Sequence, residues 1–142
     1  METKQYLMQI SKLDKLIKNK LCEISQLKEL SISVSAIKSG DKIQKTPDFD
    51  KIGNFYCKIE FLENNLNALI DEYVDKKEKI ISQIDSMEDE IYYEVLFERY
   101  IQKKTFERIA ADMNYSFRNI TRVHGKALKA FEKKYGYLYL EK

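Results

Sequence analysis

The stretch MNYSFRNITRVHGKAL, near the C-terminal end of the chain, carries side chains whose chemistry suits the edges of nucleic-acid bases. Arg118 and Arg122 are one helical turn apart, and an arginine can donate two parallel hydrogen bonds to guanine O6 and N7. Asn119 can reach adenine or a phosphate, and Phe117 and Thr121 carry groups that can contact a thymine methyl. The stretch therefore predicts a surface that contacts DNA bases.

These side chains need a helix to present them, and the apolar residues between them recur at helical spacing. The apolar set is Ile120, Val123, Ala127, Leu128 and Phe131. The pattern predicts a recognition helix of about 117–134, whose N-terminal half enters the major groove. Gly125 weakens such a helix by up to about 1 kcal/mol relative to Ala, so we expect it to let the backbone approach a phosphate or a neighbouring helix. His124, beside the buried face, is expected to pack or to contact a phosphate rather than to catalyse.

The residues ahead of this helix predict a second, shorter helix and a sharp turn. Thr105 can cap a helix over 106–113, and Asn114 tolerates the left-handed conformation that ends one. Ser116 can cap the next helix by accepting a hydrogen bond from the amide of residue 118 or 119. A helix-turn-helix also needs a small residue where its helices cross and apolar residues at fixed positions. These are Ala110, and then Ile109, Met113, Tyr115, Ile120 and Val123, with Tyr115 and Ile120 placed for a hydrophobic staple.

Most of the positive charge lies in the same part of the chain. Residues 1–98 hold 14 Lys and Arg against 19 Asp and Glu, whereas residues 99–134 hold 10 against three, a net charge of +7. Such a basic segment is typical of a module that binds a polyanion, although a solvated basic surface is the simpler alternative. Contacts to DNA phosphates, which hold register without reading sequence, are predicted for seven residues. They are Lys103, Lys104, Thr105, Arg108, Ser116, Lys126 and Lys129.

The segment from Asp89 to Lys134 resembles region 4 of sigma factors: an entry helix, a Thr-capped helix, a Ser-capped recognition helix and a KAL run. With the long helical region and the stretch GDKIQKTPDFDKI ahead of it, the chain is similar to phage-encoded ArpU/RinA-like late-gene activators. The resemblance covers nearly the whole chain, but only the C-terminal third is specific. It implies a transcriptional regulator of phage or prophage genes in a bacterial host cell. A cytoplasmic location is expected on other grounds, because the charges scattered through the first residues are not typical of a signal peptide.

The sigma-factor positions that match Phe117, Arg118 and Arg122 read promoter bases and usually hold Arg, Glu and Gln. All three residues differ here, so the resemblance implies that a different DNA sequence is recognised. Two other functions fit the same pattern. One is a DNA-packaging module similar to small terminase subunits, and the other is a coiled-coil protein-interaction protein.

The first part of the chain predicts long helices, so the fold class is all-α. Apolar residues repeat at steps of four and three over about 3–35, and again from Phe55 to about Ser86. A loop over about 36–50 separates the two, and we expect an antiparallel, coiled-coil-like hairpin over 1–86. The side chains expected to widen its apolar stripe are Leu7, Leu16, Leu21 and Leu30. We expect this acidic hairpin to form a homodimer or to contact a protein such as host RNA polymerase.

The predicted domains are the hairpin over 1–86, the sigma region 4-like helix-turn-helix domain over 87–136 and a tail over 137–142. In the second domain, Ser86 is expected to cap an entry helix of about 87–102, with the acids of EDE in its first turn.

Several classes of function and site lack the residues that they need. One histidine cannot serve a catalytic set, and the sequence has no Gly-rich phosphate loop, so no enzymatic activity and no cofactor are expected. Cys22 and Cys57 form no CxxC pair, so no metal site is expected, and both thiols are predicted to be reduced small hydrophobes. No apolar run approaches the roughly 20 residues of a membrane span.

Overall fold

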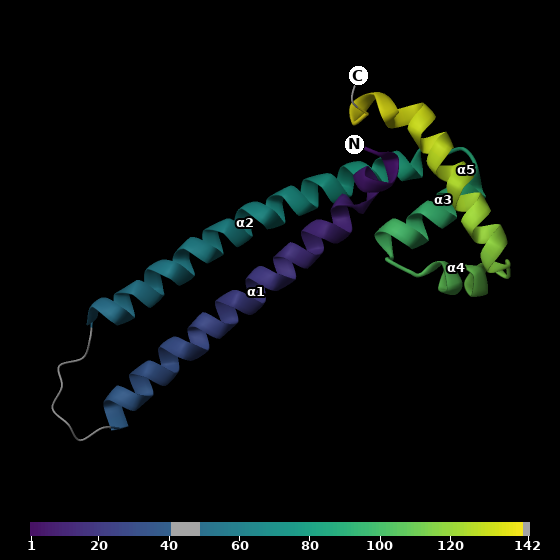
Figure 1. The fold of residues 1–142 in the computed structure, drawn as a ribbon. Helices are drawn as coiled ribbons and strands as arrows, with labels where there is room; N and C mark the ends of the chain where they lie inside the picture. Colours follow the sequence, from purple (N-terminus) through teal and green to yellow (C-terminus); the bar gives the residue numbers. More distant parts are fainter. Residues whose placement is uncertain (41–48, 141–142) are drawn as a thin grey trace. The chain divides into compact units, whose positions relative to one another are not determined.

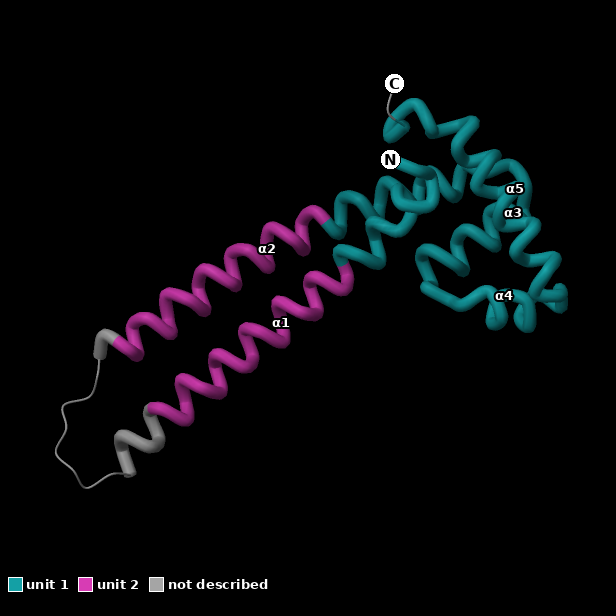
Figure 2. Tube along the Cα trace, viewed as in Figure 1, with its two compact units in different colours: residues 1–13, 73–142 teal, residues 14–72 magenta. Residues whose placement is uncertain are grey.

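The computed structural model describes residues 1–40 and 49–140, and the backbone alone at residues 35–40 and 49–50. The described residues are helical and include no strand, which confirms the predicted all-α class (Figure 1). The elements in chain order are α1 (Thr3–Gly40), α2 (Phe49–Asp85), α3 (Glu90–Leu96), the π-helical turn η1 (Phe97–Ile101), α4 (Phe106–Met113), α5 (Phe117–Tyr135) and the 3₁₀ turn η2 (Gly136–Leu138). The chain divides into two compact units (Figure 2).

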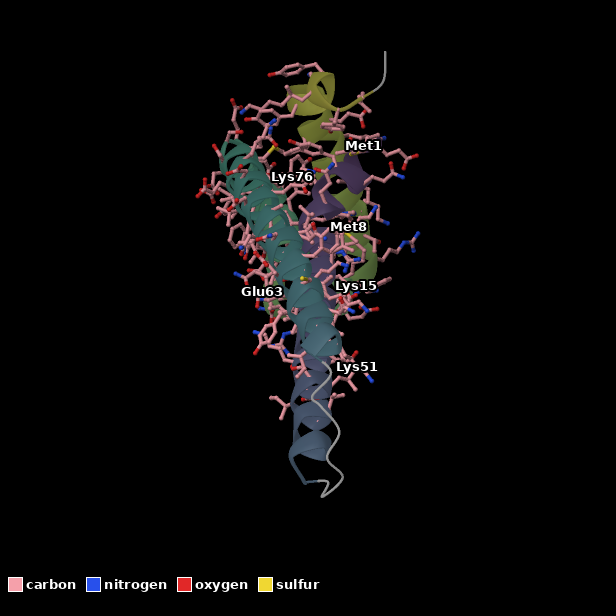
Figure 3. All side chains as sticks on the ribbon, turned by 90° about the vertical axis from the view of Figure 1, so that its left-hand side faces the viewer. Met1, Met8, Lys15, Lys51, Glu63 and Lys76 are labelled. Carbon is pink, nitrogen blue, oxygen red and sulfur yellow. The ribbon has the colours of Figure 1, made fainter. Side chains whose placement is uncertain are left out.

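Unit 2, residues 14–72, consists of the parts of α1 and α2 that lie side by side and run in opposite directions (Figure 2). A narrow row of apolar side chains joins them. Its buried members are Ile24, Ile59, Leu62 and Leu66, with Ile17 and Leu27 packed against them. Lys28 bridges to Glu63 across the two helices at 3.2 Å. In Figure 3, Glu63 lies on one side of the view, and Lys15 and Lys51 lie on the other.

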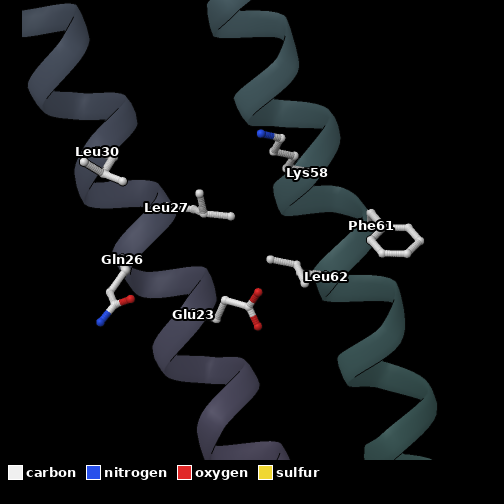
Figure 4. A pocket seen from close by; sticks show the side chains of 7 residues that line it. All are labelled: Glu23, Gln26, Leu27, Leu30, Lys58, Phe61 and Leu62. Atoms are coloured by element: carbon white, nitrogen blue, oxygen red, sulfur yellow. The ribbon is translucent and has the colours of Figure 1, made fainter.

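The predicted apolar stripe of this region is wider than the one that the structure buries. Leu7 is buried, but Leu16, Leu21 and Leu30 are exposed, because a helix that packs on one neighbour covers only a narrow face. One face of unit 2 also has a hollow of about 340 Å³ between the helices (Figure 4). Its lining residues are Glu23, Gln26, Leu27, Leu30, Lys58, Phe61 and Leu62.

Two further expectations for this region need correction. Cys22 and Cys57 are free thiols, but both are exposed, so they do not serve as packed small hydrophobes. The helices are also longer than predicted, since α1 continues to Gly40 and α2 begins at Phe49. The predicted loop over 36–50 is therefore too long at both ends, and its central residues, 41–48, lie outside the described residues.

Unit 1 combines the first turns of α1 with everything from Tyr73 onward (Figure 2). Its largest cluster of buried residues draws on α1, α2, α3, η1 and α5. The members are Tyr6, Leu7, Ile10, Ile80, Ile84, Leu96, Tyr100, Ala127 and Phe131. Near the C-terminus, Tyr139 stacks on Tyr6 with ring centroids 4.3 Å apart, and its hydroxyl donates to the hydroxyl oxygen of Thr3 at 2.8 Å. Part of the predicted tail is therefore packed on the N-terminal helix.

The entry helix starts later than predicted and has a different cap. The Ser86 hydroxyl donates to the carbonyl of Gln83 in the last turn of α2, and Ser86 lies three residues before the N-cap position of α3, so it does not cap that helix. Instead, the carboxylate of Asp89 accepts hydrogen bonds from the amides of Ile91 and Tyr92. Of the EDE acids, only Glu90 lies within the first turn. No helix among the described residues is both long and apolar enough to span a membrane.

Candidate nucleic-acid interface

The chain between α4 and α5 turns as its local residues predict. The Thr105 hydroxyl oxygen accepts from the amide of Arg108 at 3.2 Å, which caps α4. Asn114 ends α4 in the left-handed conformation, with φ 58° and ψ 38°. The Ser116 hydroxyl oxygen then accepts from the amide of Asn119 at 3.1 Å and caps α5. Both helix starts and the turn between them are thus fixed by short-range hydrogen bonds.

A compact apolar cluster holds α4 and α5 against α3. Val95 is the buried member from α3, and Ala110 is a buried member from α4. The other buried members are Ile109, Ile120 and Val123, with Tyr92, Phe106, Met113 and Tyr115 packed against them. All five apolar positions expected between 109 and 123 therefore belong to one cluster. This packing fixes which face of α5 is left outside.

The five residues predicted to contact bases lie in the N-terminal half of α5, and none of them is a buried member of this cluster. Arg118 and Arg122 are exposed, Phe117 is 50% exposed, and Asn119 and Thr121 are half-buried. The Phe117 ring also meets Phe106 of α4 edge to face at 6.5 Å. Phe117 is thus partly held by the fold, whereas the two arginines extend from it.

Three of these five side chains already take part in hydrogen bonds within the helix. Arg122 donates from Nη2 to Oδ1 of Asn119 at 2.8 Å. The Thr121 hydroxyl donates to the backbone carbonyl of Arg118 at 2.9 Å. The free part of Thr121 is therefore mainly its methyl group, which suits the predicted apolar contact with a thymine.

Two residues predicted to contact phosphates form ion pairs with acids of the chain. Lys104 forms an ion pair with Glu98 and a second with Asp112 at 3.1 Å, and Arg108 approaches Asp112 at 3.4 Å. Hydrogen bonds to Glu98 and Asp112 raise the pKa of Lys104, and the hydrogen bond from Lys104 lowers the pKa of Asp112. These cations meet a DNA phosphate only if they leave Asp112 or share it.

The basic face of α5 differs from that of α4 in this respect. Among the described residues, no ion pair engages Arg118, Arg122, Lys126 or Lys129. Spacings of three, four and seven residues place these four cations on one side of the helix. Lys103 is exposed in the loop before α4, with a left-handed φ of 58°. The positive charge that is available to a polyanion therefore lies chiefly along α5.

The sequence left two alternative roles for each of two α5 residues, His124 and Gly125, and the structure narrows both choices. His124 is buried, and its Nε2 lies 2.7 Å from the Tyr100 hydroxyl, so it packs and does not reach a phosphate. For Gly125, a Cβ atom would meet no described atom within 4 Å. A neighbouring helix therefore does not require this glycine, and approach to a phosphate remains the prediction.

Sequence reasoning did not find the contacts that shape the loop before α4. The Arg99 guanidinium lies 4.2 Å from the centre of the Phe106 ring, and its Nη1 donates to the backbone carbonyl of Lys104 at 3.0 Å. The sequence shows Arg99 only as one cation of the basic segment 99–134, whereas in the structure its side chain holds the loop that contains Lys103 and Lys104.

Comparisons of the chain with protein-family models, curated proteins and solved structures found no match. Among the described residues, no three His, Cys, Asp or Glu side chains are grouped so that they could hold a metal ion.

Proposed function

We propose that the chain is a sequence-specific DNA-binding protein in which α4 and α5 act as a helix-turn-helix. The N-terminal half of α5 enters the major groove, with Arg118 and Arg122 directed at base edges. One observation carries this proposal. Caps at both helix starts and the cluster below them hold α5 so that two arginines, unpaired with any described acid, extend one turn apart.

The proposal extends to transcription because of the resemblance to sigma region 4 and to phage late-gene activators. In that role the protein binds a promoter in a bacterial host cell and regulates phage or prophage genes. The α1–α2 pair then acts as a coiled-coil hairpin that dimerises or contacts host RNA polymerase. The exposed side chains of Leu30 and Phe61 beside the hollow in unit 2 support such a protein contact (Figure 4).

The proposal is tested by fluorescence anisotropy of labelled duplex DNA at two salt concentrations. The double variant Arg118→Ala/Arg122→Ala is compared with the parent chain, and circular dichroism checks that it folds. A matched control, Lys15→Ala/Lys58→Ala, removes two exposed cations from unit 2. We expect binding that weakens steeply with salt, is lost in the α5 variant and is kept by the control.

Two results would contradict the proposal. Equal binding by the folded α5 variant would remove the groove assignment, and no DNA binding at any salt would favour a protein-interaction protein. Native mass spectrometry distinguishes the proposed regulator from the remaining alternative, a DNA-packaging module. A ring that binds DNA would favour a module similar to small terminase subunits, whereas a monomer or dimer with a defined footprint favours the regulator.

A further inference from the structure

We infer, on the basis of the proposed function, that Asn119 is a positioning residue that holds Arg122 toward guanine and does not itself read adenine. The observation is the hydrogen bond from Nη2 of Arg122 to Oδ1 of Asn119. Both residues lie on the N-terminal half of α5, three positions apart, so the contact fits one turn of helix.

The chemistry of the two groups fixes which atom of Asn119 faces the arginine. A guanidinium only donates hydrogen bonds, so the carboxamide oxygen must face it and the NH₂ group must face elsewhere. Arg122 uses one of its five N–H groups in this contact. The others remain able to form two parallel bonds with O6 and N7 of a guanine.

The backbone of Asn119 is fixed independently of its side chain. Its amide donates to the Ser116 hydroxyl oxygen, which caps α5. The side chain is half-buried, which limits its freedom further. Because the cap uses the amide of residue 119, a change of side chain at this position leaves the helix start intact, so positioning and folding can be tested separately.

The same contact disfavours adenine. An asparagine reads adenine by accepting from the N6 amino group through Oδ1 while donating to N7. With Arg122 on Oδ1, the N6 amino group would meet an oxygen that already faces a cationic donor. Oδ1 has a second lone pair, but its orientation toward Arg122 turns the carboxamide from the geometry that pairs with adenine N6 and N7 together, so the intact pair favours guanine recognition through Arg122.

The experiment selects bound sequences from a pool of randomised duplexes and then measures affinities for single-base variants of the preferred duplex. The parent chain is compared with Asn119→Ala, Asn119→Asp and Arg122→Ala. Arg122→Ala should lose its preference for guanine at one position by roughly 5- to 150-fold. Asn119→Ala should lose at least about threefold at that same position. Asn119→Asp keeps an acceptor for Arg122, so it should retain the preference even if phosphate repulsion weakens overall binding.

Release of Asn119 gives a second readout that a merely structural residue would not produce. In Arg122→Ala the free carboxamide should acquire a preference for adenine, and this preference should vanish in Arg122→Ala/Asn119→Ala. An unchanged guanine preference in Asn119→Ala would overturn the inference, and so would an adenine preference of the parent chain that Asn119→Ala abolishes. If either contradicting result appears while Arg118→Ala/Arg122→Ala still loses binding, the inference about Asn119 fails but the proposed DNA-binding function is kept. If the parent chain binds no DNA, both fail.

Discussion

The Tyr100 hydroxyl lies 2.7 Å from Nε2 of His124, and both side chains are buried in unit 1. The Phe106 ring packs against the imidazole in a T-shaped arrangement, with the two ring centroids 4.8 Å apart. Burial, followed by the positive charges of Arg99 and Lys4, lowers the pKa of His124 from 6.5 to about 4. At neutral pH the imidazole is therefore uncharged, and α5 is joined to η1 through a neutral hydrogen bond.

This pair predicts how stability depends on pH. In the unfolded chain His124 takes up a proton near pH 6.5, whereas in the folded chain it resists until about pH 4. The unfolded state thus binds more protons in that window, and the stability present above pH 6.5 is lost as the pH falls. We expect a loss of about 2 kcal/mol between pH 7.5 and pH 5. Urea unfolding across this range measures it.

His124→Gln provides the control, because glutamine cannot titrate. The variant should lose some stability at pH 7.5 but should show a much flatter pH dependence down to pH 5. Carboxylates titrate mainly below this window, so they contribute similarly to both proteins. The same slope in the variant and the parent chain would show that His124 is not the group responsible.

The sequence predicted the α4–α5 region well because short-range chemistry determines it. Thr105, Asn114 and Ser116 each act within about four residues, so caps and a turn residue define the bounds without knowledge of the rest of the fold. The apolar spacing then selects the buried face. Helical periodicity in the first 85 residues likewise predicted two long helices, with the start of α1 and the end of α2, although not the two ends that flank the predicted loop.

Contacts between distant residues were beyond the same reasoning. Lys104 stays a predicted phosphate contact, but its ion pairs with Glu98 in η1 and with Asp112 near the end of α4 were not predicted. His124 lay on the border of the buried face, and only the position of Tyr100 settles its role. Side-chain periodicity shows which face is buried but not which polar groups meet there.

Substitutions of Asn114 and Ser116 test how much the turn between α4 and α5 contributes to the stability of the fold. Asn114→Ala should cost about 1 kcal/mol, because alanine lacks the short polar side chain that lets asparagine tolerate the left-handed conformation at φ 58°. Asn114→Gly should be nearly neutral, since glycine adopts that conformation freely. Ser116→Ala should cost about 1 kcal/mol through the lost cap. Shifts of the urea midpoint measure all three, and equal effects of alanine and glycine at position 114 would argue against the strain.

Asp112 should restrain DNA binding, given the proposed function. Its carboxylate pairs with Lys104 and Arg108, so it competes with phosphates for both cations. Asp112→Asn should raise the affinity several-fold at low salt and steepen the salt dependence by roughly 0.9 in log–log slope for each cation released to a phosphate. Asp71→Asn, an exposed change of equal charge in unit 2, is the control. Equal gains in both variants would indicate a general charge effect.

A substitution of Gly125 is expected to change stability and DNA affinity in opposite directions. Because a Cβ would meet no described atom within 4 Å, Gly125→Ala should stabilise α5 by roughly 0.5–1 kcal/mol. If the backbone there approaches a DNA phosphate, the added methyl group should weaken DNA binding although the fold is more stable. Urea unfolding and anisotropy on the same preparation measure both effects. Ala130→Gly, also on α5, should do the reverse for stability. A more stable variant with unchanged affinity would show that DNA does not approach the helix at Gly125.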